Sequence, residues 1–122
     1  MDKKLLGAYG EIIAVRYLIT HGYYVVTTNF ESRIGELDIV AEDKKYICFV
    51  EVKTRSENSI SAPADAVDKA KRERIIATTQ SFLKKYKVTK RQPRFDIIEV
   101  YFKGDEPERV NHIKNAFDFY GN

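Results

Sequence analysis

The chain has 122 residues, of which 43% are hydrophobic and 32% are charged. This balance is typical of a folded protein and excludes an intrinsically disordered one. The length allows one hydrophobic core without disulfides or a structural metal, so we expect a single domain over residues 1–122.

The cysteine count and the hydropathy pattern exclude further classes. Cys48 is the single cysteine, which excludes a disulfide within the chain and a cysteine-based zinc site. It lies in the most apolar run, which predicts a buried small side chain. No run approaches the length of a membrane span, and the first residues lack the apolar stretch of a signal peptide. We therefore expect a cytoplasmic protein with no membrane partner.

Basic residues are concentrated in one segment. The net charge is only +3, but residues 69–94 hold ten of the 21 Lys and Arg residues and one of the 18 Asp and Glu residues. A solvated helix surface is the commonest fate of such charges. The near absence of acids beside them favours contact with nucleic acid. The ten are Lys69, Lys71, Arg72, Arg74, Lys84, Lys85, Lys87, Lys90, Arg91 and Arg94.

The first predicted element is a helix from Lys3 to His21, which Gly22 ends. Its apolar stripe is predicted to comprise Leu5, Leu6, Tyr9, Ile12, Ile13 and Tyr17. Glu11 stands out because its helical neighbours are apolar. From spacing alone, it is a partly exposed glutamate at the edge of the stripe.

A strand over 23–28 and a loop over 29–35 are expected to lead into a β-hairpin. The hairpin strands are 35–40 and 46–53, both rich in β-branched and aromatic residues, and a polar turn over 42–45 separates them. The run from Tyr46 to Val50 is apolar at every position, which is typical of a central strand buried on both faces.

Three charged residues of this hairpin are expected to converge. Glu51 and Lys53 project to one face of their strand, and an even-numbered turn places Asp38 on the same face. A buried ion-pair network is one explanation for such a cluster. Two acids and one base leave a negative excess, however, and a hard divalent cation with oxygen ligands would compensate for it. The pattern therefore favours a cation site.

The second half of the chain is expected to add a helix and two strands. Residues 54–62 are predicted to form a loop at the mouth of the site, and Pro63 begins a helix or helical pair that ends near Tyr86. Its inward residues are predicted to be Val67, Ala70, Ile75, Ala77, Phe82, Leu83 and Tyr86. A strand over 95–102, a turn over 103–107 and an edge strand over 109–114 follow.

Few residues near the carboxyl end carry chemical signals. Asp96 is expected to be structural, either pairing with Arg94 or capping the end of the sheet. His21 and His112 lack metal-ligand spacing and are interpreted as surface histidines. Residues 116–120 are expected to form an apolar tail that packs on the body. The element order predicts an α/β sandwich around a mixed central sheet flanked by helices.

The order of these motifs resembles a known family. Asp38, twelve intervening residues and then Glu51-Val52-Lys53 look like the signature of the PD-(D/E)xK nuclease superfamily, which has a restriction-endonuclease-like fold. Together with further segments, the chain resembles the bacterial YraN-type family, which is similar in layout to archaeal Holliday-junction resolvases. Those segments are Gly10-Glu11, Gly35-Glu36-Leu37-Asp38, Phe49 to Arg55, Lys71-Arg72 and Arg94-Phe95-Asp96. Leu37 departs from the proline of the superfamily name, but that proline is not a ligand.

The resemblance implies a set of catalytic residues. Asp38 and Glu51 would bind Mg²⁺ or Mn²⁺, and Glu11 would bind a second ion or orient a water molecule. Lys53 would position the water molecule or stabilise developing negative charge. Glu36 lies on the same strand face as Asp38 and would contact the metal ligands without binding the metal itself. The expected nucleic-acid-binding residues are Arg55, Lys69, Lys71, Arg72, Arg74 and Arg94, with Arg55 open also to pairing with a nearby carboxylate.

Three functions remain open from the sequence. The first is a metal-dependent endonuclease acting on DNA, including branched or structured DNA. The second is a non-catalytic nucleic-acid-binding module that retains the nuclease fold. The third is an interaction partner whose basic helix binds an acidic protein. Analogy with junction resolvases, which need two sites to cut two strands, adds a homodimer to the first function.

Overall fold

The structure is a computed structural model that describes residues 1–56, 67–87 and 90–122. The described ranges contain two α-helices and five β-strands. In chain order these are α1 (Lys3–Thr20), β1 (Tyr24–Glu31), β2 (Glu36–Glu42), β3 (Tyr46–Ser56), α2 (Lys69–Tyr86), β4 (Gln92–Lys103) and β5 (Glu106–Phe117).

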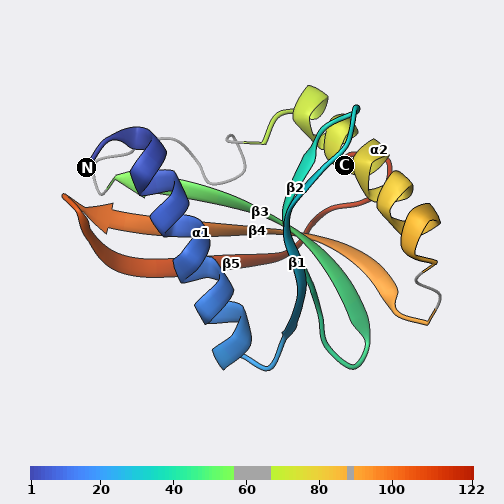
Figure 1. Cartoon of the computed structure of the whole chain (residues 1–122), viewed down its shortest axis with the longest axis horizontal. Helices are drawn as coiled ribbons and strands as arrows, with labels where there is room; N and C mark the ends of the chain where they lie inside the picture. The colour runs from blue at the N-terminus through green and yellow to red at the C-terminus, as the bar shows by residue number, and fades with distance from the viewer. Residues whose placement is uncertain (57–66, 88–89) are drawn as a thin grey trace.

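The five strands form one mixed sheet in the order β1-β2-β3-β4-β5 (Figure 1). Neighbouring strands are antiparallel except β3 and β4, which pair in parallel from Tyr46–Gln92 to Ser56–Phe102. A parallel pair needs a crossover connection, and α2 lies in that connection. The expected hairpin is confirmed, with Ile39 opposite Val50 and Glu42 opposite Ile47. The central position predicted for β3 is confirmed as well.

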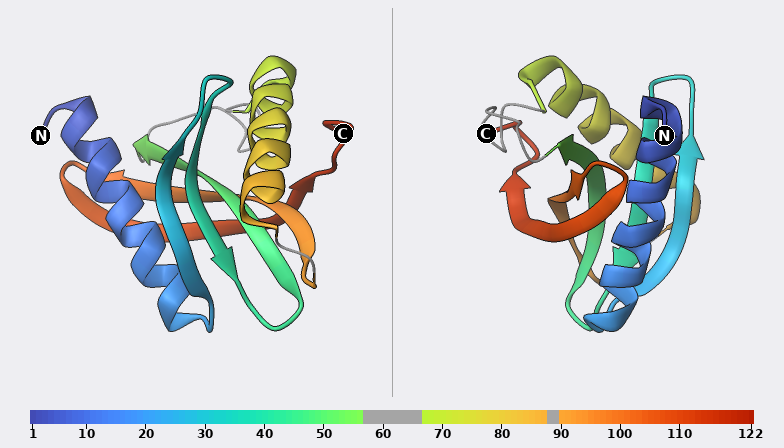
Figure 2. Two further views of the ribbon diagram at one scale, coloured as in Figure 1. Left: turned by 45° about the vertical axis from the view of Figure 1, so that its right-hand side comes forward. Right: turned by 90° about the vertical axis from the view of Figure 1, so that its left-hand side faces the viewer.

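The helices lie on different sides of the sheet, as Figure 2 shows. On one side, α2 packs Ile75, Ile76 and Phe82 against residues such as Phe49 and Phe95. On the other side, α1 packs Ala14 and Leu18 against Ile39, Val50 and Ile98. Alternate residues of the central strands therefore enter two separate cores. The fold is the expected α/β sandwich, consistent with a restriction-endonuclease-like architecture.

Both helices have the end signals that their sequences indicate. The Asp2 carboxylate accepts a hydrogen bond from the Leu5 amide and caps α1, and the Asp68 carboxylate accepts one from the Lys71 amide and caps α2. Gly22 follows α1 with a φ of +89°, a left-handed conformation that glycine adopts without strain. The predicted end of the first helix is confirmed.

The inward face of α1 differs from the predicted stripe. Its buried residues are Gly10, Ala14 and Leu18, whereas the Leu5 and Ile12 side chains are both 59% exposed. Small residues at four-residue spacing let the helix lie close to the sheet, so that a Cβ atom on Gly10 would overlap with Cγ2 of Thr54. Four residues of the predicted stripe pack against the core as expected, namely Leu6, Tyr9, Ile13 and Tyr17. The prediction was therefore wrong for Leu5 and Ile12, and it omitted the buried residues Gly10, Ala14 and Leu18.

Similar differences apply to α2 and the chain end. The expected burial of Val67, Ile75 and Phe82 is confirmed, but Ala70 and Tyr86 are exposed. Thr78 and Thr79, which the apolar pattern did not include, are fully buried. At the carboxyl end, the expected apolar tail packs in part. Phe117 is buried and the Phe119 ring contacts Phe95, whereas Tyr120 is exposed.

Several strands are longer than predicted. β1 continues through Asn29 to Glu31, which leaves only 32–35 as the turn into β2. β3 continues to Ser56 because it pairs with β4 along its whole length, so residues 54–56 are not a loop. β5 likewise covers 106–117. The rest of the predicted loop, 57–62, and the expected helix start at Pro63 lie outside the described residues.

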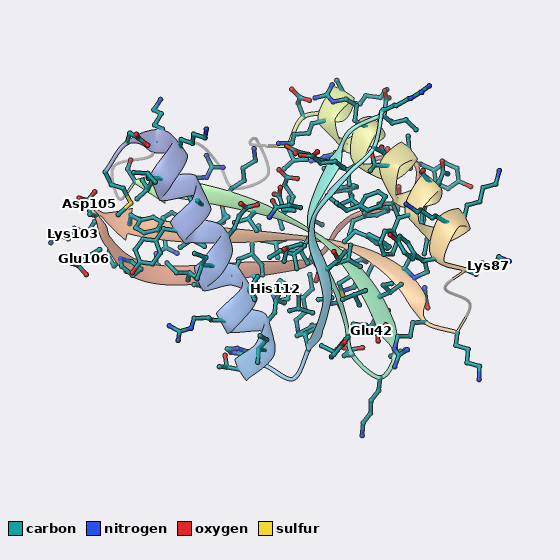
Figure 3. All side chains as sticks on the ribbon, viewed as in Figure 1. Glu42, Lys87, Lys103, Asp105, Glu106 and His112 are labelled. Carbon is teal, nitrogen blue, oxygen red and sulfur yellow. The ribbon has the colours of Figure 1, made fainter. Side chains whose placement is uncertain are left out.

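A buried polar network links β4 and β5 and corrects the prediction for His112. The Arg94 guanidinium donates two hydrogen bonds of 2.8 Å to the Asp96 carboxylate, as one of the expected roles of Asp96 required. His112 Nε2 lies 2.7 Å from Asp96 Oδ2, and the His112 side chain is only 3% exposed, between α1 and the sheet (Figure 3). Strand pairing buries this histidine, whereas His21 is exposed as predicted.

The predicted burial of Cys48 is confirmed. Cys48 is a free, fully buried thiol, and burial raises its pKa to about 12. Neither described helix is long and apolar enough to cross a lipid bilayer.

The close approach of α1 to β3 gives a stability prediction. Gly10→Ala lowers the free energy of unfolding by about 1–2 kcal/mol, because the new methyl group overlaps with Thr54. Gly7→Ala, in the same helix with no atom within 4 Å of the new methyl group, raises it by about 1 kcal/mol through helix propensity. Chemical denaturation measures both. Thr54→Ser removes the overlapping methyl group and restores stability to Gly10→Ala, and equal effects at the two glycines would contradict the close packing.

Candidate functional site: a carboxylate and lysine cluster

Strands β2 and β3 separate beside Asp38. Their paired residues run from Glu42–Ile47 to Ile39–Val50, although β2 begins earlier and β3 continues to Ser56. Beyond the last pair, the Asp38 carboxylate accepts a 2.8 Å hydrogen bond from the Val52 amide. The Asp38 side chain, and not the backbone of β2, therefore accepts the hydrogen bond from this amide of β3. The two strands diverge at this point.

Glu51 is the next carboxylate, and two lysines approach it. Its Oε1 lies 2.8 Å from Lys71 Nζ and 3.9 Å from Lys53 Nζ. The Glu51 side chain is 9% exposed, compared with 25% for Lys53 and 34% for Lys71. Asp38, Glu51 and Lys53 therefore converge, as the alternation of side chains in the predicted hairpin indicated. Lys71 joins them from the first turn of α2.

Glu11 and Glu36 complete the cluster. Both line one surface hollow together with Asp38, Glu51 and Lys53, and Lys71 lines it as well. Glu11 reaches this hollow from the middle of α1 and Glu36 from the start of β2. The hollow thus lies where both helices approach the diverging strands. All four sequence-predicted catalytic residues, Glu11 among them, share one site.

Burial and mutual repulsion perturb the acids of the cluster. Burial, together with the neighbouring Glu51 charge, raises the pKa of Asp38 from 3.8 to about 7, although the Val52 hydrogen bond acts in the opposite direction. The pKa of Glu11 is also raised, by burial and then by repulsion from Glu36 and Glu51. The cluster therefore contains more negative charge than its lysines compensate for.

The two lysines shift in opposite directions. Burial, followed by the neighbouring Lys71, lowers the pKa of Lys53. Burial is the largest single influence on the pKa of Lys71 and would lower it, but the hydrogen bond to Glu51 together with the nearby Glu51 and Asp38 charges outweighs burial and raises this pKa. Lys71 is thus the firmly protonated partner of Glu51. Lys53 is the cation that loses its proton more easily.

The donor set fits a hard divalent cation. In the described part of the chain, no three Asp, Glu, His or Cys side chains are assembled as a complete metal site. Mg²⁺ does not require one, because it is commonly held by one or two carboxylates, with water and substrate phosphate as its other ligands. Asp38 and Glu51 supply two carboxylates, and their unfavourable crowding is what a cation would relieve.

The predicted nucleic-acid-binding residues divide into two groups. Three have internal partners: Arg55 lies 3.4 Å from the Glu99 carboxylate, Arg72 donates to the carbonyls of Val67 and Gly121, and Arg94 bonds Asp96. For Arg55, this is the carboxylate pairing that the sequence left open. Their guanidinium groups thus make contacts within the fold.

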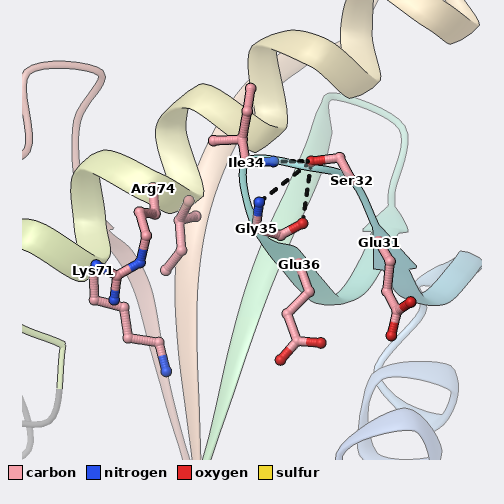
Figure 4. A pocket seen from close by; sticks show the side chains of 8 residues that line it. Glu31, Ser32, Ile34, Gly35, Glu36, Lys71 and Arg74 are labelled. Atoms are coloured by element: carbon pink, nitrogen blue, oxygen red, sulfur yellow. Dashed lines mark hydrogen bonds between the residues drawn. The ribbon is translucent and has the colours of Figure 1, made fainter.

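The remaining predicted contacts lie on α2. Lys69 and Arg74 are exposed. Arg74 and Lys71 line a second hollow between α2 and the β1–β2 turn, and Glu31 and Glu36 line its strand side (Figure 4). In that turn, Ser32 Oγ accepts hydrogen bonds from the Ile34 and Gly35 amides.

Sequence reasoning missed that Lys71 belongs to the carboxylate cluster. It placed Lys71 among the basic surface residues of the helix, because the pairing of Lys71 with Glu51 depends on how α2 docks. A usable signal was present, since an Asp68 cap fixes Lys71 in the first turn of the helix. Lys3 and Lys4, which also line the hollow, were not singled out either.

Comparisons with known proteins identify the family. Residues 10–100 match the model of the family described as "Uncharacterised protein family UPF0102". The chain belongs to this family. A UPF0102 protein of Caldanaerobacter subterraneus subsp. tengcongensis is 44% identical over 119 residues, which cover 96% of this chain and 98% of that protein. UPF0102 proteins of Acetivibrio thermocellus (42% identical; 95% and 93% covered) and Syntrophotalea carbinolica (44%; 95% and 94%) are similarly close.

The family match includes the whole hairpin and the first turn of α2. All the residues of the cluster, from Glu11 to Lys71, lie within the 10–100 match to UPF0102. The YraN-type resemblance is thereby confirmed at the level of the family.

The raised pKa of Asp38 predicts how stability depends on pH. Between about pH 4 and 7, folded Asp38 keeps a proton that the unfolded chain has released, so folding stability falls as the pH rises through this window. Asp38→Asn removes this penalty. We expect the variant to be more stable than the wild type at pH 8, by about 2 kcal/mol, and the difference to shrink towards pH 4.

Denaturation at pH values from 4 to 8 measures this difference. Glu108→Gln is the matched control, because it neutralises one exposed carboxylate of β5 outside the cluster. A difference between wild type and Asp38→Asn that stays constant over the whole range would contradict the raised pKa.

Proposed function

We propose that this protein is a metal-dependent endonuclease that hydrolyses phosphodiester bonds in DNA, including branched or structured DNA. One observation carries the proposal: Asp38, Glu51 and Lys53 converge at the point where β2 and β3 diverge. Two carboxylates that can hold a divalent cation and a lysine beside them, all in one hollow, can support phosphodiester hydrolysis.

The sequence order and the fold support this proposal. Asp38 followed by Glu51-Val52-Lys53 resembles the PD-(D/E)xK signature, and the mixed sheet with a helix on each side is consistent with the fold of that superfamily. The aspartate lies on one strand of a hairpin and the glutamate and lysine on the other. The resemblance therefore extends from the residues to the elements that hold them.

Four residues of the cluster have roles in the proposed reaction. Asp38 and Glu51 would hold Mg²⁺ or Mn²⁺, which lowers the pKa of bound water and offsets charge on the scissile phosphate. Lys53 would orient the attacking water molecule or donate to a phosphate oxygen. Glu11, with its raised pKa, can accept or donate a hydrogen bond to water at the α1 side of the hollow.

Basic residues around the hollow would bind the DNA backbone. Lys3 and Lys4 border it from the start of α1, and Lys69 and Arg74 are exposed on the first turns of α2. The cluster thus lies between two sets of cations. This arrangement is expected for a site that binds a DNA strand on both sides of the scissile phosphate. Cutting both strands at a branch needs two such sites, so the proposal for branched DNA includes a homodimer.

Activity assays with three variants test the catalytic assignment. Wild-type protein is expected to cut labelled DNA only when Mg²⁺ or Mn²⁺ is present. Asp38→Asn, Glu51→Gln and Lys53→Met each lower the rate by about 100-fold or more, because each removes a group that acts on the reacting phosphate or its metal. Linear duplex, single-stranded and four-way-junction substrates in parallel identify the substrate class.

Two further measurements make this assay decisive. Glu108→Gln keeps wild-type activity, and all three site variants keep their affinity for DNA in a gel-shift assay. Calorimetric titration with Mn²⁺ shows binding by the wild type and weaker binding by Glu51→Gln. DNA binding without metal binding or cleavage would support the non-catalytic module instead of the nuclease.

The salt dependence of DNA binding tests the proposed contacts of α2. Lys69→Ala together with Arg74→Ala weakens binding and lowers the slope of log affinity against log salt concentration by about one per lost phosphate contact. Lys84→Ala, an exposed residue at the other end of α2, serves as the control and leaves the slope unchanged. Fluorescence anisotropy at several salt concentrations provides these slopes. Equal slopes for all variants would exclude the first turns of α2 from the interface.

A further inference from the structure

Lys71 of α2 forms an ion pair with Glu51 inside the carboxylate cluster. Lys71 Nζ lies 2.8 Å from Glu51 Oε1, whereas Lys53 Nζ lies 3.9 Å from the same oxygen. Lys71 is thus the closer cation to a carboxylate that the proposed function assigns to the metal. An ammonium group and a divalent cation compete for the same carboxylate oxygen.

The backbone of Lys71 is fixed by the cap of α2, while its side chain is held only through its terminal ammonium group. Its amide donates a 2.8 Å hydrogen bond to the Asp68 carboxylate in the cap of α2. The side chain, however, is 34% exposed and has a flexible four-carbon stem. Lys71 also lines both hollows, the one that contains the carboxylates and the one between α2 and the β1–β2 turn (Figure 4). A change of rotamer can therefore carry its ammonium group from one hollow to the other.

We propose that Lys71 is the counterion of Glu51 in the metal-free protein, and that a divalent cation displaces it towards Arg74, where it contacts a DNA phosphate. This inference rests on the proposed function, because it takes Glu51 to be a metal ligand and DNA to be the substrate. Lys71 and Arg74 then form a pair of cations beside the reacting phosphate. The same lysine compensates the site before metal binding and binds substrate after it.

The proposal predicts opposite effects of one substitution. Lys71→Met keeps most of the length of the side chain and removes the competing charge. Affinity for Mn²⁺, measured by calorimetry, is expected to rise about tenfold, while the cleavage rate at saturating metal falls about tenfold because a phosphate contact is lost. A purely structural role would lower both, since a disturbed site binds metal and cuts DNA less well.

Two control variants separate the contact from general effects of charge and folding. Lys69→Met removes an exposed positive charge from the same turn of α2, and its Mn²⁺ affinity is expected to stay within about twofold of the wild type. Lys71→Arg keeps the positive charge, and its Mn²⁺ affinity is expected to remain near that of the wild type.

The outcomes distinguish this inference from the proposed function. Mn²⁺ affinity that is unchanged or weaker in Lys71→Met, alongside cleavage by the wild type, would overturn the role of Lys71 and leave the nuclease standing. An equal rise in Lys69→Met would also overturn it, by showing a general effect of charge. Absence of Mn²⁺ binding in every variant would overturn the metal site and the competition with it.

Discussion

The hydrogen bond from the Val52 amide to the Asp38 carboxylate is the interaction on which the candidate site depends. Backbone pairing between β2 and β3 extends to Ile39 and Val50, and the Asp38 side chain continues it by one bond of 2.8 Å. A carboxylate can do this only by entering a half-buried position beside Glu51, which costs free energy. The same bond that joins the strands therefore creates the acidic cluster between them.

Residues from the amino-terminal halves of both helices contribute to the charge balance of this cluster. Glu11 arrives from α1 and Lys71 from α2, and each changes the ionisation of the strand residues. Lys71 compensates Glu51, and Lys53 is left with a lowered pKa. The proposed cation would relieve repulsion that the fold alone leaves in place.

Much of this arrangement could be predicted because it depends on local rules. Strand alternation and the parity of the turn were sufficient to bring Asp38 and Glu51 to one face. The contributions of distant elements could not be predicted in the same way. Lys71 reaches Glu51 only because α2 docks beside β2, and His112 is buried only because β5 pairs along β4. The predicted inward face of α1 was incomplete for a related reason, since Gly10 packs closely against Thr54, a strand residue that no helical pattern reveals.

The most direct test of the central claim, that this cluster is built to hold a divalent cation, is an NMR titration of the Asp38 carboxyl carbon with and without Mg²⁺. Without metal, the resonance is expected to report a pKa near 7. With saturating Mg²⁺, the carboxylate stays ionised, so the transition should move below about pH 5. Identical titrations with and without Mg²⁺ would contradict the claim. They would make the Asp38 and Glu51 pair a feature of the fold alone.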